Sequence, residues 1–94
     1  MKTTPHLRPS LENYAFEFTD TFGGEANYTW VHRGTVQARS LRGAVTMAKR
    51  ELGLTGHRCR SEQWGDESAL YPVGSCTVLF VRWEESVPDV PATV

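Results

Sequence analysis

The stretch Ser40–Leu52 carries its apolar residues at the spacing of an amphipathic helix. These residues fall three, four, seven and eleven positions after the first and form one stripe: Leu41, Ala44, Val45, Ala48 and Leu52. The hydroxyl of Ser40 can cap the first turn, and Gly53 can adopt the left-handed backbone just beyond the last turn. We therefore predict a single helix over Ser40–Leu52 with this stripe buried.

Five other stretches are predicted to be β-strands, and the first three of them show the two-residue alternation of a strand. The five stretches are Tyr14–Phe18, Asn27–Arg33, His57–Gln63, Ser68–Tyr71 and Ser75–Trp83. The first two are separated by Gly23-Gly24, which suits a turn, so we expect them to pair as a hairpin. The last stretch is apolar on both faces, which is typical of a central strand.

The order of these elements, β-β-α-β-(β)-β, predicts an α+β fold in which one helix packs on a mostly antiparallel sheet. Ninety-four residues are enough for one domain, which we place at residues 11–85. The flanking segments 1–10 and 86–94 contain prolines, and we expect both to be flexible.

The core predicted from these patterns is small, because a chain of this length buries only roughly 60–65% of its extended surface. Phe16, Val78 and Phe80 are expected to be buried within it. A core of this size is also expected to need the aromatic rings of Tyr28 and Trp30.

The formal net charge is −1, which argues against a DNA mimic and against a strongly basic nucleic-acid binder. The charges are nevertheless grouped along the chain. Arg33–Arg60 contains seven bases and one acid, whereas Glu12–Glu25 contains four acids and no base. Folding could pair these blocks across the sheet or place them on separate surfaces.

No stretch of the sequence is long enough to span a membrane. Residues 1–10 lack the apolar run of a secretory signal. Two cysteines, Cys59 and Cys76, fit a reduced compartment. We therefore expect a cytoplasmic protein that keeps both thiols free.

Metal, cofactor and enzyme chemistry are not expected. His32, His57, Cys59 and Cys76 are the only set that could bind zinc, but structural zinc sites usually have two close ligand pairs. This chain has one such pair, His57 and Cys59. We therefore expect both cysteines to be core residues, with Cys76 in the most apolar strand. Neither a nucleophile–base pair nor a phosphate-binding loop is recognisable.

Arginine and tryptophan provide the strongest binding signal, since eight of the ten basic residues are arginines. Trp64 follows Arg58 and Arg60 on the same strand parity, and Trp and Arg are enriched at binding hot spots. We predict this cluster as the binding site. Alternatively, Trp64 could cover the core, and the two arginines could pair with Glu17 or Glu62 across strands.

A second candidate patch lies on the helix, opposite the apolar stripe. It consists of Arg42, Lys49 and Arg50, near Arg39. The patch lacks an aromatic residue, so we rank it below Trp64. The alternative role for this patch is a solubilising face.

Two runs, Phe18–Val31 and Leu54–Arg60, resemble segments of small uncharacterised open reading frames of bacteriophages and prophages. The resemblance extends over about Tyr14–Trp83 and assigns no functional residue. It implies the cytoplasm of a bacterial host and an accessory phage role. Short phage proteins often bind host machinery, and anti-defence inhibitors such as anti-CRISPR proteins are one example.

Two hypotheses follow for the function. The first is a non-catalytic binding protein that acts on a host protein or complex, for example as an anti-defence inhibitor. The alternative is a nucleic-acid-binding accessory protein that uses the basic block Arg33–Arg60 with Tyr28 or Trp30 as stacking platforms.

Overall fold

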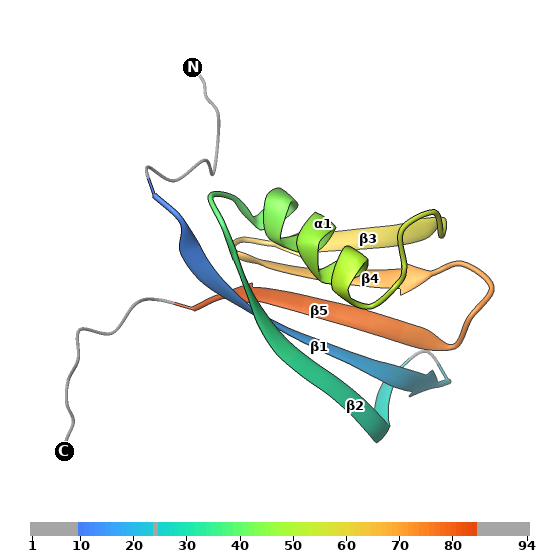
Figure 1. Ribbon diagram of the computed structural model, residues 1–94. Coiled ribbons are helices and arrows are strands. Elements are labelled where there is room, and N and C mark those ends of the chain that lie inside the picture. The colour runs from blue at the N-terminus through green and yellow to red at the C-terminus, as the bar shows by residue number, and fades with distance from the viewer. Residues whose placement is uncertain (1–9, 24, 85–94) are drawn as a thin grey trace, which may run out of the picture.

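The computed structural model describes residues 10–23 and 25–84. Its elements are β1 (Glu12–Phe22), β2 (Glu25–Ala38), α1 (Leu41–Glu51), β3 (Cys59–Trp64), β4 (Glu67–Pro72) and β5 (Thr77–Trp83). One helix packs on one antiparallel sheet, so the predicted α+β fold is confirmed (Figure 1). Apart from Ser10, the predicted flexible segments 1–10 and 86–94 lie outside the described residues.

The sheet has the strand order β2-β1-β5-β4-β3, and every neighbouring pair is antiparallel. β5, the strand that is apolar on both faces, occupies the centre as predicted. Hairpins join β1 to β2, β3 to β4 and β4 to β5, and the crossover from β2 to β3 carries α1. Within the described residues, no helix is long and apolar enough to cross a membrane.

The β1–β2 hairpin is longer than the sequence pattern predicts. The predicted strands end at Phe18 and begin again at Asn27, but the strand pairing continues to Phe22 and Glu25. Gly23 adopts a positive φ of 65° and begins the turn. Thr19, Thr21 and Phe22 have side chains that favour strands, which explains why the ladder extends past Phe18.

The ends of α1 are closed as predicted. The Ser40 hydroxyl accepts a hydrogen bond from the Gly43 amide at 3.0 Å, which satisfies one of the free amides of the first turn. At the other end, Gly53 has a φ of 73°, and the Leu54 amide donates to the Lys49 carbonyl at 2.7 Å. This arrangement stops the helix and turns the chain back toward the sheet.

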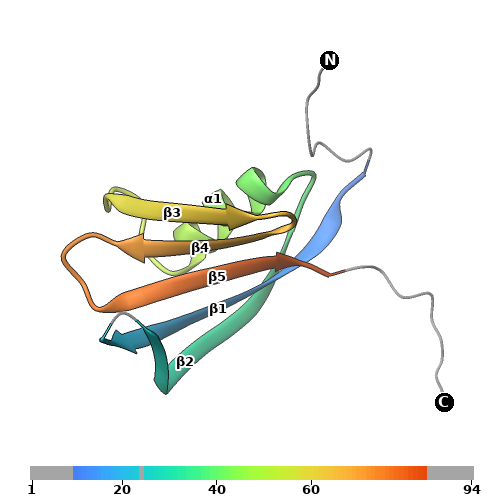
Figure 2. The same cartoon turned by 180° about the vertical axis from the view of Figure 1, so that it is seen from behind.

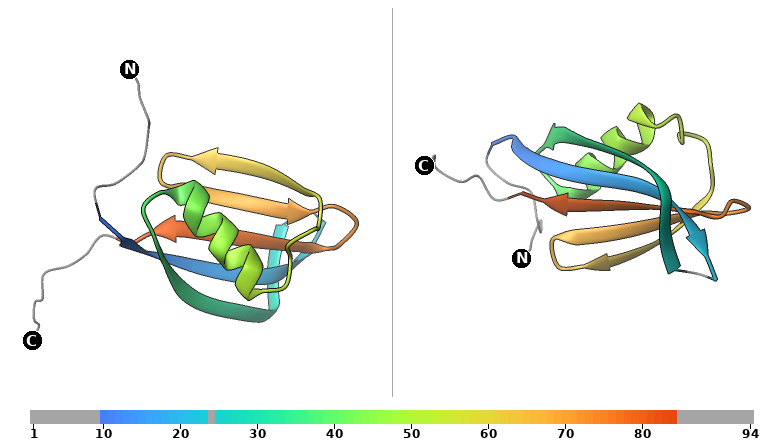
Figure 3. Two further views of the ribbon diagram at one scale, coloured as in Figure 1. Left: turned by 45° about the horizontal axis from the view of Figure 1, so that its top comes forward. Right: turned by 90° about the horizontal axis from the view of Figure 1, so that it is seen from below.

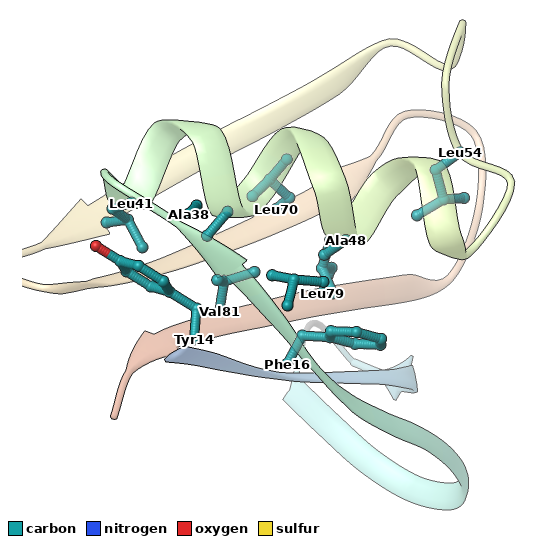
Figure 4. Close-up of a cluster of buried hydrophobic side chains, with 11 residues drawn as sticks. Tyr14, Phe16, Ala38, Leu41, Ala48, Leu54, Leu70, Leu79 and Val81 are labelled. Atoms are coloured by element: carbon teal, nitrogen blue, oxygen red, sulfur yellow. The ribbon is translucent and has the colours of Figure 1, made fainter. Parts of the chain in front are cut away.

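The core fills the space between α1 and one face of the sheet (Figure 4). From the predicted helix stripe, Leu41, Ala44 and Ala48 are buried, and Val45 and Leu52 are partly buried at its margin. The sheet contributes buried side chains from four strands: Tyr14, Phe16, Val36, Ala38, Leu70, Leu79 and Val81.

Three aromatic residues that were predicted to be buried are only partly buried or exposed. Phe16 and Val78 are buried as expected, but Phe80, which lies on the face without a described helix, is only half-buried. Tyr28 and Trp30 are 47% and 40% exposed. One helix covers one face, so aromatic residues beyond its reach stay in contact with solvent.

The ring of Phe16 packs across the backbone of Gly34, its direct partner on β2. A methyl group added to Gly34 would lie 2.6 Å from Cζ of this ring, which is closer than two carbon atoms can approach. Because Phe16 is 5% exposed, the ring has little room to move. Glycine at position 34 therefore allows the aromatic ring to enter the core.

We predict that Gly34→Ala destabilises the protein by about 1–3 kcal/mol, because the new methyl group overpacks the core. Alanine also lowers the conformational entropy of the unfolded chain, which offsets about 0.4–1 kcal/mol of this loss. Urea denaturation measures the change. Phe16→Leu should be less costly in the Gly34→Ala background than alone, because the smaller side chain leaves room for the new methyl group. Thr35→Ala, an exposed neighbour, serves as the control. Equal stability of Gly34→Ala and the wild type would contradict this account.

Candidate functional site

No described helix lies on the face of the sheet opposite α1 (Figure 2), although Thr19, Ala69 and Val78 on this face are fully buried. We call this face the open face. The strand register places two rows of side chains across it. One row contains Trp64, Glu67, Arg82, Ala15 and Thr35, and the next contains Glu62, Ala69, Phe80, Glu17 and Arg33. This face therefore mixes aromatic side chains with charges of both signs.

A groove of about 500 Å³ runs over the open face. Its aromatic lining residues are Phe16, Tyr28 and Phe80, and its cations are Arg33 and Arg82. Its carboxylates are Glu17, Glu67 and Glu84. The groove thus combines apolar area with directional donors and acceptors, which is the usual composition of a binding pocket.

Glu17 connects Tyr28 and Arg33, two of the β2 residues that line the groove. Its carboxylate accepts hydrogen bonds from Arg33 Nε at 2.8 Å and from the Tyr28 hydroxyl at 3.1 Å. The Arg33 guanidinium, with help from Tyr28, lowers the pKa of Glu17 below its ordinary value against the opposing effect of burial. Desolvation and the Glu17 carboxylate raise the pKa of Tyr28, so its hydroxyl stays protonated and donates.

Tyr28 has a backbone φ of 57°. A bulky aromatic residue in this left-handed region is strained. Its position is an irregularity in the β1–β2 ladder between the pairs Thr19–Val31 and Thr21–Ala26. β1 has one residue in this interval, whereas β2 has four, residues 27–30. The bulge thus re-aims Tyr28 onto the open face.

Asp20, the single β1 residue opposite the bulge, holds it in place. Its carboxylate accepts hydrogen bonds from the Thr29 amide at 2.9 Å, from Asn27 Nδ2 at 3.1 Å and from the Thr29 hydroxyl. These donors, the Thr29 hydroxyl foremost, lower the pKa of Asp20 well below its ordinary 3.8. The strained backbone is therefore fixed by a network built around one carboxylate.

On the other side of the sheet, Trp30 packs against Phe18 and His32, with ring centroids 5.4 and 5.5 Å apart. His32 is the direct partner of Phe18 across the hairpin. These rings extend the helix-side core toward the distal end of the hairpin, beyond the end of α1. Trp30 and Tyr28 therefore face opposite sides of β2, although the sequence pattern placed them on one face.

The predicted cluster Trp64, Arg58 and Arg60 lies at the β3 edge of the sheet, while Tyr28 and Arg33 lie on β2 at the opposite edge. Trp64 is 55% exposed and stays in regular register opposite Glu67. The Arg60 guanidinium lies 5.2 Å from the centre of the Tyr71 ring. The binding role of the cluster stays a prediction.

The second predicted patch lies on α1, on the other side of the sheet from the groove (Figure 3). Arg42 and Arg50 are exposed, and Lys49 is half-buried. The groove lining contains neither this patch nor Trp64, Arg58 and Arg60. The sequence indicates Tyr28 only as a stacking platform in the nucleic-acid alternative and otherwise assigns it to the core, because a regular strand pattern places it there.

The structure corrects the assignment of Cys76. This residue lies in the loop before β5 and is exposed, whereas it was predicted inside the apolar strand. Cys59 is half-buried at the margin of the core, and both thiols are free. Across residues 10–23 and 25–84, groups of three or more His, Cys, Asp or Glu side chains suited to a metal ion are absent.

Comparisons with known proteins add no relative to this picture. No family model, curated protein or solved structure matches the chain. The fold alone therefore defines the class of protein. It is a small α+β domain with a helix on one face of its sheet and an open face on the other side. The strained Tyr28 beside the groove is the feature that most resembles a functional adaptation, because such strain collects at binding and active sites.

We predict that acid releases the bulge around Tyr28. Since the pKa of Asp20 in the folded protein lies below its ordinary value of 3.8, its stabilisation is complete above about pH 4 and is lost on further acidification. The Thr29 amide should lose protection from hydrogen exchange as the pH falls below about 4. Asp20→Asn should lose this protection at neutral pH.

Glu25→Gln is the matched control, because it removes an exposed carboxylate from the same end of the hairpin. It should leave the Thr29 amide protected. Full protection of this amide in Asp20→Asn would show that Asp20 does not hold the bulge.

Proposed function

We propose that this protein is a non-catalytic binding module that holds a segment of a partner protein on its open sheet face. The observation that supports the proposal most directly is the strained Tyr28, fixed by Asp20 beside a groove of about 500 Å³. Strain at a residue that adds nothing to the core is explained if the residue is needed for recognition.

The composition of the groove favours a protein partner. Tyr28 and Phe80 offer apolar area with few rotamers to immobilise, and Arg82 offers directional donors for carboxylates or carbonyl groups. Arg33 is already held by Glu17 at 2.8 Å, so it is preorganised. Anchors of this kind, surrounded by polar groups, are typical of binding hot spots.

The charges of the groove argue against a nucleic acid as its ligand. Two arginines and three glutamates line it. Phosphate groups need a surplus of positive charge, because most non-specific nucleic-acid affinity comes from phosphate contacts. A mixed-charge surface instead suits a polypeptide carrying both kinds of group.

The resemblance to phage and prophage reading frames suggests where such a partner would be found. A host protein or complex in the bacterial cytoplasm fits that resemblance, and blocking a defence complex, as anti-CRISPR proteins do, is one form this activity could take. The proposal requires no enzyme chemistry, metal or cofactor.

One observation favours the nucleic-acid alternative. Tyr28 and Trp30, considered as stacking platforms, are 47% and 40% exposed rather than buried in the core. They lie on opposite sides of β2, however, so a single strand cannot stack on both at once. The arginines of Arg33–Arg60 are likewise divided between α1 and the sheet.

We predict that Tyr28→Gly separates stability from binding. Glycine relieves the left-handed strain, so the variant should be about 1 kcal/mol more stable than the wild type. Loss of the aromatic ring should weaken capture of the host partner by about 2 kcal/mol, which is roughly thirtyfold. Thermal melting and quantitative affinity capture from a bacterial host measure the two effects.

Met47→Ala is the control for this experiment, because Met47 is an exposed apolar residue on α1. It should leave capture unchanged. If Tyr28→Gly binds normally and Arg42→Glu does not, the functional surface is the helix patch and the open-face proposal fails.

We predict that the protein is not retained on DNA or RNA at about 150 mM salt, because the open face carries no excess of cations. Chromatography on immobilised nucleic acid over a range of salt concentrations tests this directly. Retention that falls steeply with salt, and is reduced by Trp30→Ala, would establish the nucleic-acid alternative instead.

A further inference from the structure

β3 is a bare edge strand. No described element lies beyond it (Figure 3), and five of its six residues are exposed. It pairs with β4 in unbroken register from Cys59 to Trp64. A regular, exposed edge presents unpaired backbone N–H and C=O groups, which can pair with a strand of another chain.

The opposite edge of the sheet differs from β3. β2 carries the irregularity at residues 27–30, and bulges of this kind twist an edge away from further pairing. β3 has no such feature and contains no proline. Of the two edges, β3 is therefore the one that is suited to strand addition.

The turn between β3 and β4 fixes which backbone groups of β3 point outward. Trp64 and Glu67 flank the two-residue turn Gly65-Asp66, in which Gly65 has a φ of 59°, so they form a hydrogen-bonded pair. Hydrogen-bonded residues alternate along an antiparallel pair. The Val73 amide donates to the Arg58 carbonyl at 2.7 Å. Arg58 is an even number of residues from Trp64, so this bond agrees with the same alternation.

It follows that Arg60 and Glu62 direct their backbone groups toward β4, whereas Cys59, Ser61 and Gln63 direct theirs outward. When the β3 strand of a second copy pairs antiparallel with this edge, residues whose backbone groups point outward in one copy must lie opposite such residues in the other copy. This rule permits registers centred on a residue, such as Arg60, Ser61 or Glu62, and excludes registers centred between two residues. The registers centred on Ser61 and on Glu62 pair the most residues of β3.

Charge decides between the permitted registers. Centring on Arg60 places this residue opposite its own copy, and centring on Glu62 does the same for the glutamate, so both put like charges together. Centring on Ser61 places Arg60 opposite Glu62 of the second copy, and Glu62 opposite the copy's Arg60. These are non-hydrogen-bonded positions, where the side chains are closest.

We infer that the protein forms a symmetric dimer in which the β3 strands of two copies pair antiparallel about Ser61. The two five-stranded sheets then become one continuous sheet, with both Arg60–Glu62 pairs on its open face. In this register Arg58 falls opposite Trp64 of the second copy, where a guanidinium can stack on the indole. The inference does not depend on the function proposed for the groove.

The charge pairs give a sharp test. Either single substitution, Arg60→Glu or Glu62→Arg, places like charges opposite each other at both symmetry-related positions. The dimer dissociation constant of each variant should therefore be at least about tenfold higher than that of the wild type. An equimolar mixture of the two variants should restore dimers, because each chain then complements the other. The exchanged variant, Arg60→Glu with Glu62→Arg, should also dimerise. Analytical ultracentrifugation of the full chain measures all four samples.

Ser61→Pro tests the backbone pairing independently. The Ser61 amide points away from β4, so proline removes an intermolecular donor while the β3–β4 hairpin keeps its own bonds. This variant should be monomeric and folded by circular dichroism. Glu25→Arg, a charge reversal at an exposed position away from β3, should dimerise like the wild type.

Three results would overturn the inference. The first is a wild-type protein that remains monomeric up to about 1 mM, which corresponds to a binding free energy weaker than roughly 4 kcal/mol. The second is a dimer that both single reversals and Ser61→Pro leave intact, since the contact would then lie elsewhere. The third is failure of the mixed reversals to pair when each is folded.

Discussion

A single helix of eleven residues must cover a sheet of five strands. At 1.5 Å per residue such a helix is only about 16 Å long, so it can shield one face and only part of that face. Most of its packing is against β2 and β5. The open face and the β3 edge are left without a described helix for this reason, and both proposed binding surfaces are consequences of that limit.

The β1–β2 hairpin extends well past the helix, and polar contacts add to the aromatic packing of Phe18 and Trp30 in holding its far end. Asp20 supplies the acceptors that the irregular residues Asn27 and Thr29 require, and the Thr19 hydroxyl donates to the Trp30 carbonyl at 2.8 Å. Backbone groups released from the ladder must find other partners. The same network that repairs the ladder also fixes the orientation of Tyr28.

The groove and the β3 edge are separate surfaces of one sheet. In the inferred dimer, the two open faces would be joined into one continuous face, with a groove on each half. This geometry allows two copies of a partner segment to bind at once, which raises the avidity for a repetitive or dimeric partner without new contacts. Dimerisation and partner binding could then act together, although each is supported by different residues.

The sequence by itself determined the elements whose signals are local. The stripe from Leu41 to Leu52 with Ser40 and Gly53 specified the helix, and the doubly apolar β5 specified the centre of the sheet, because periodicity and capping depend on neighbouring residues. The alternation of Arg60 and Trp64 likewise placed these two side chains on one side of β3, whereas Arg58 precedes the strand.

Only the tertiary structure decided the roles of Tyr28, Phe80 and Cys76. Tyr28 leaves the core because Asp20, eight residues earlier, stabilises a bulge that breaks the two-residue period of β2. Phe80 is half-buried on the face that has no described helix, and Cys76 is exposed because β5 begins after it, at Thr77. Each outcome depends on contacts between distant segments, which local sequence patterns do not contain.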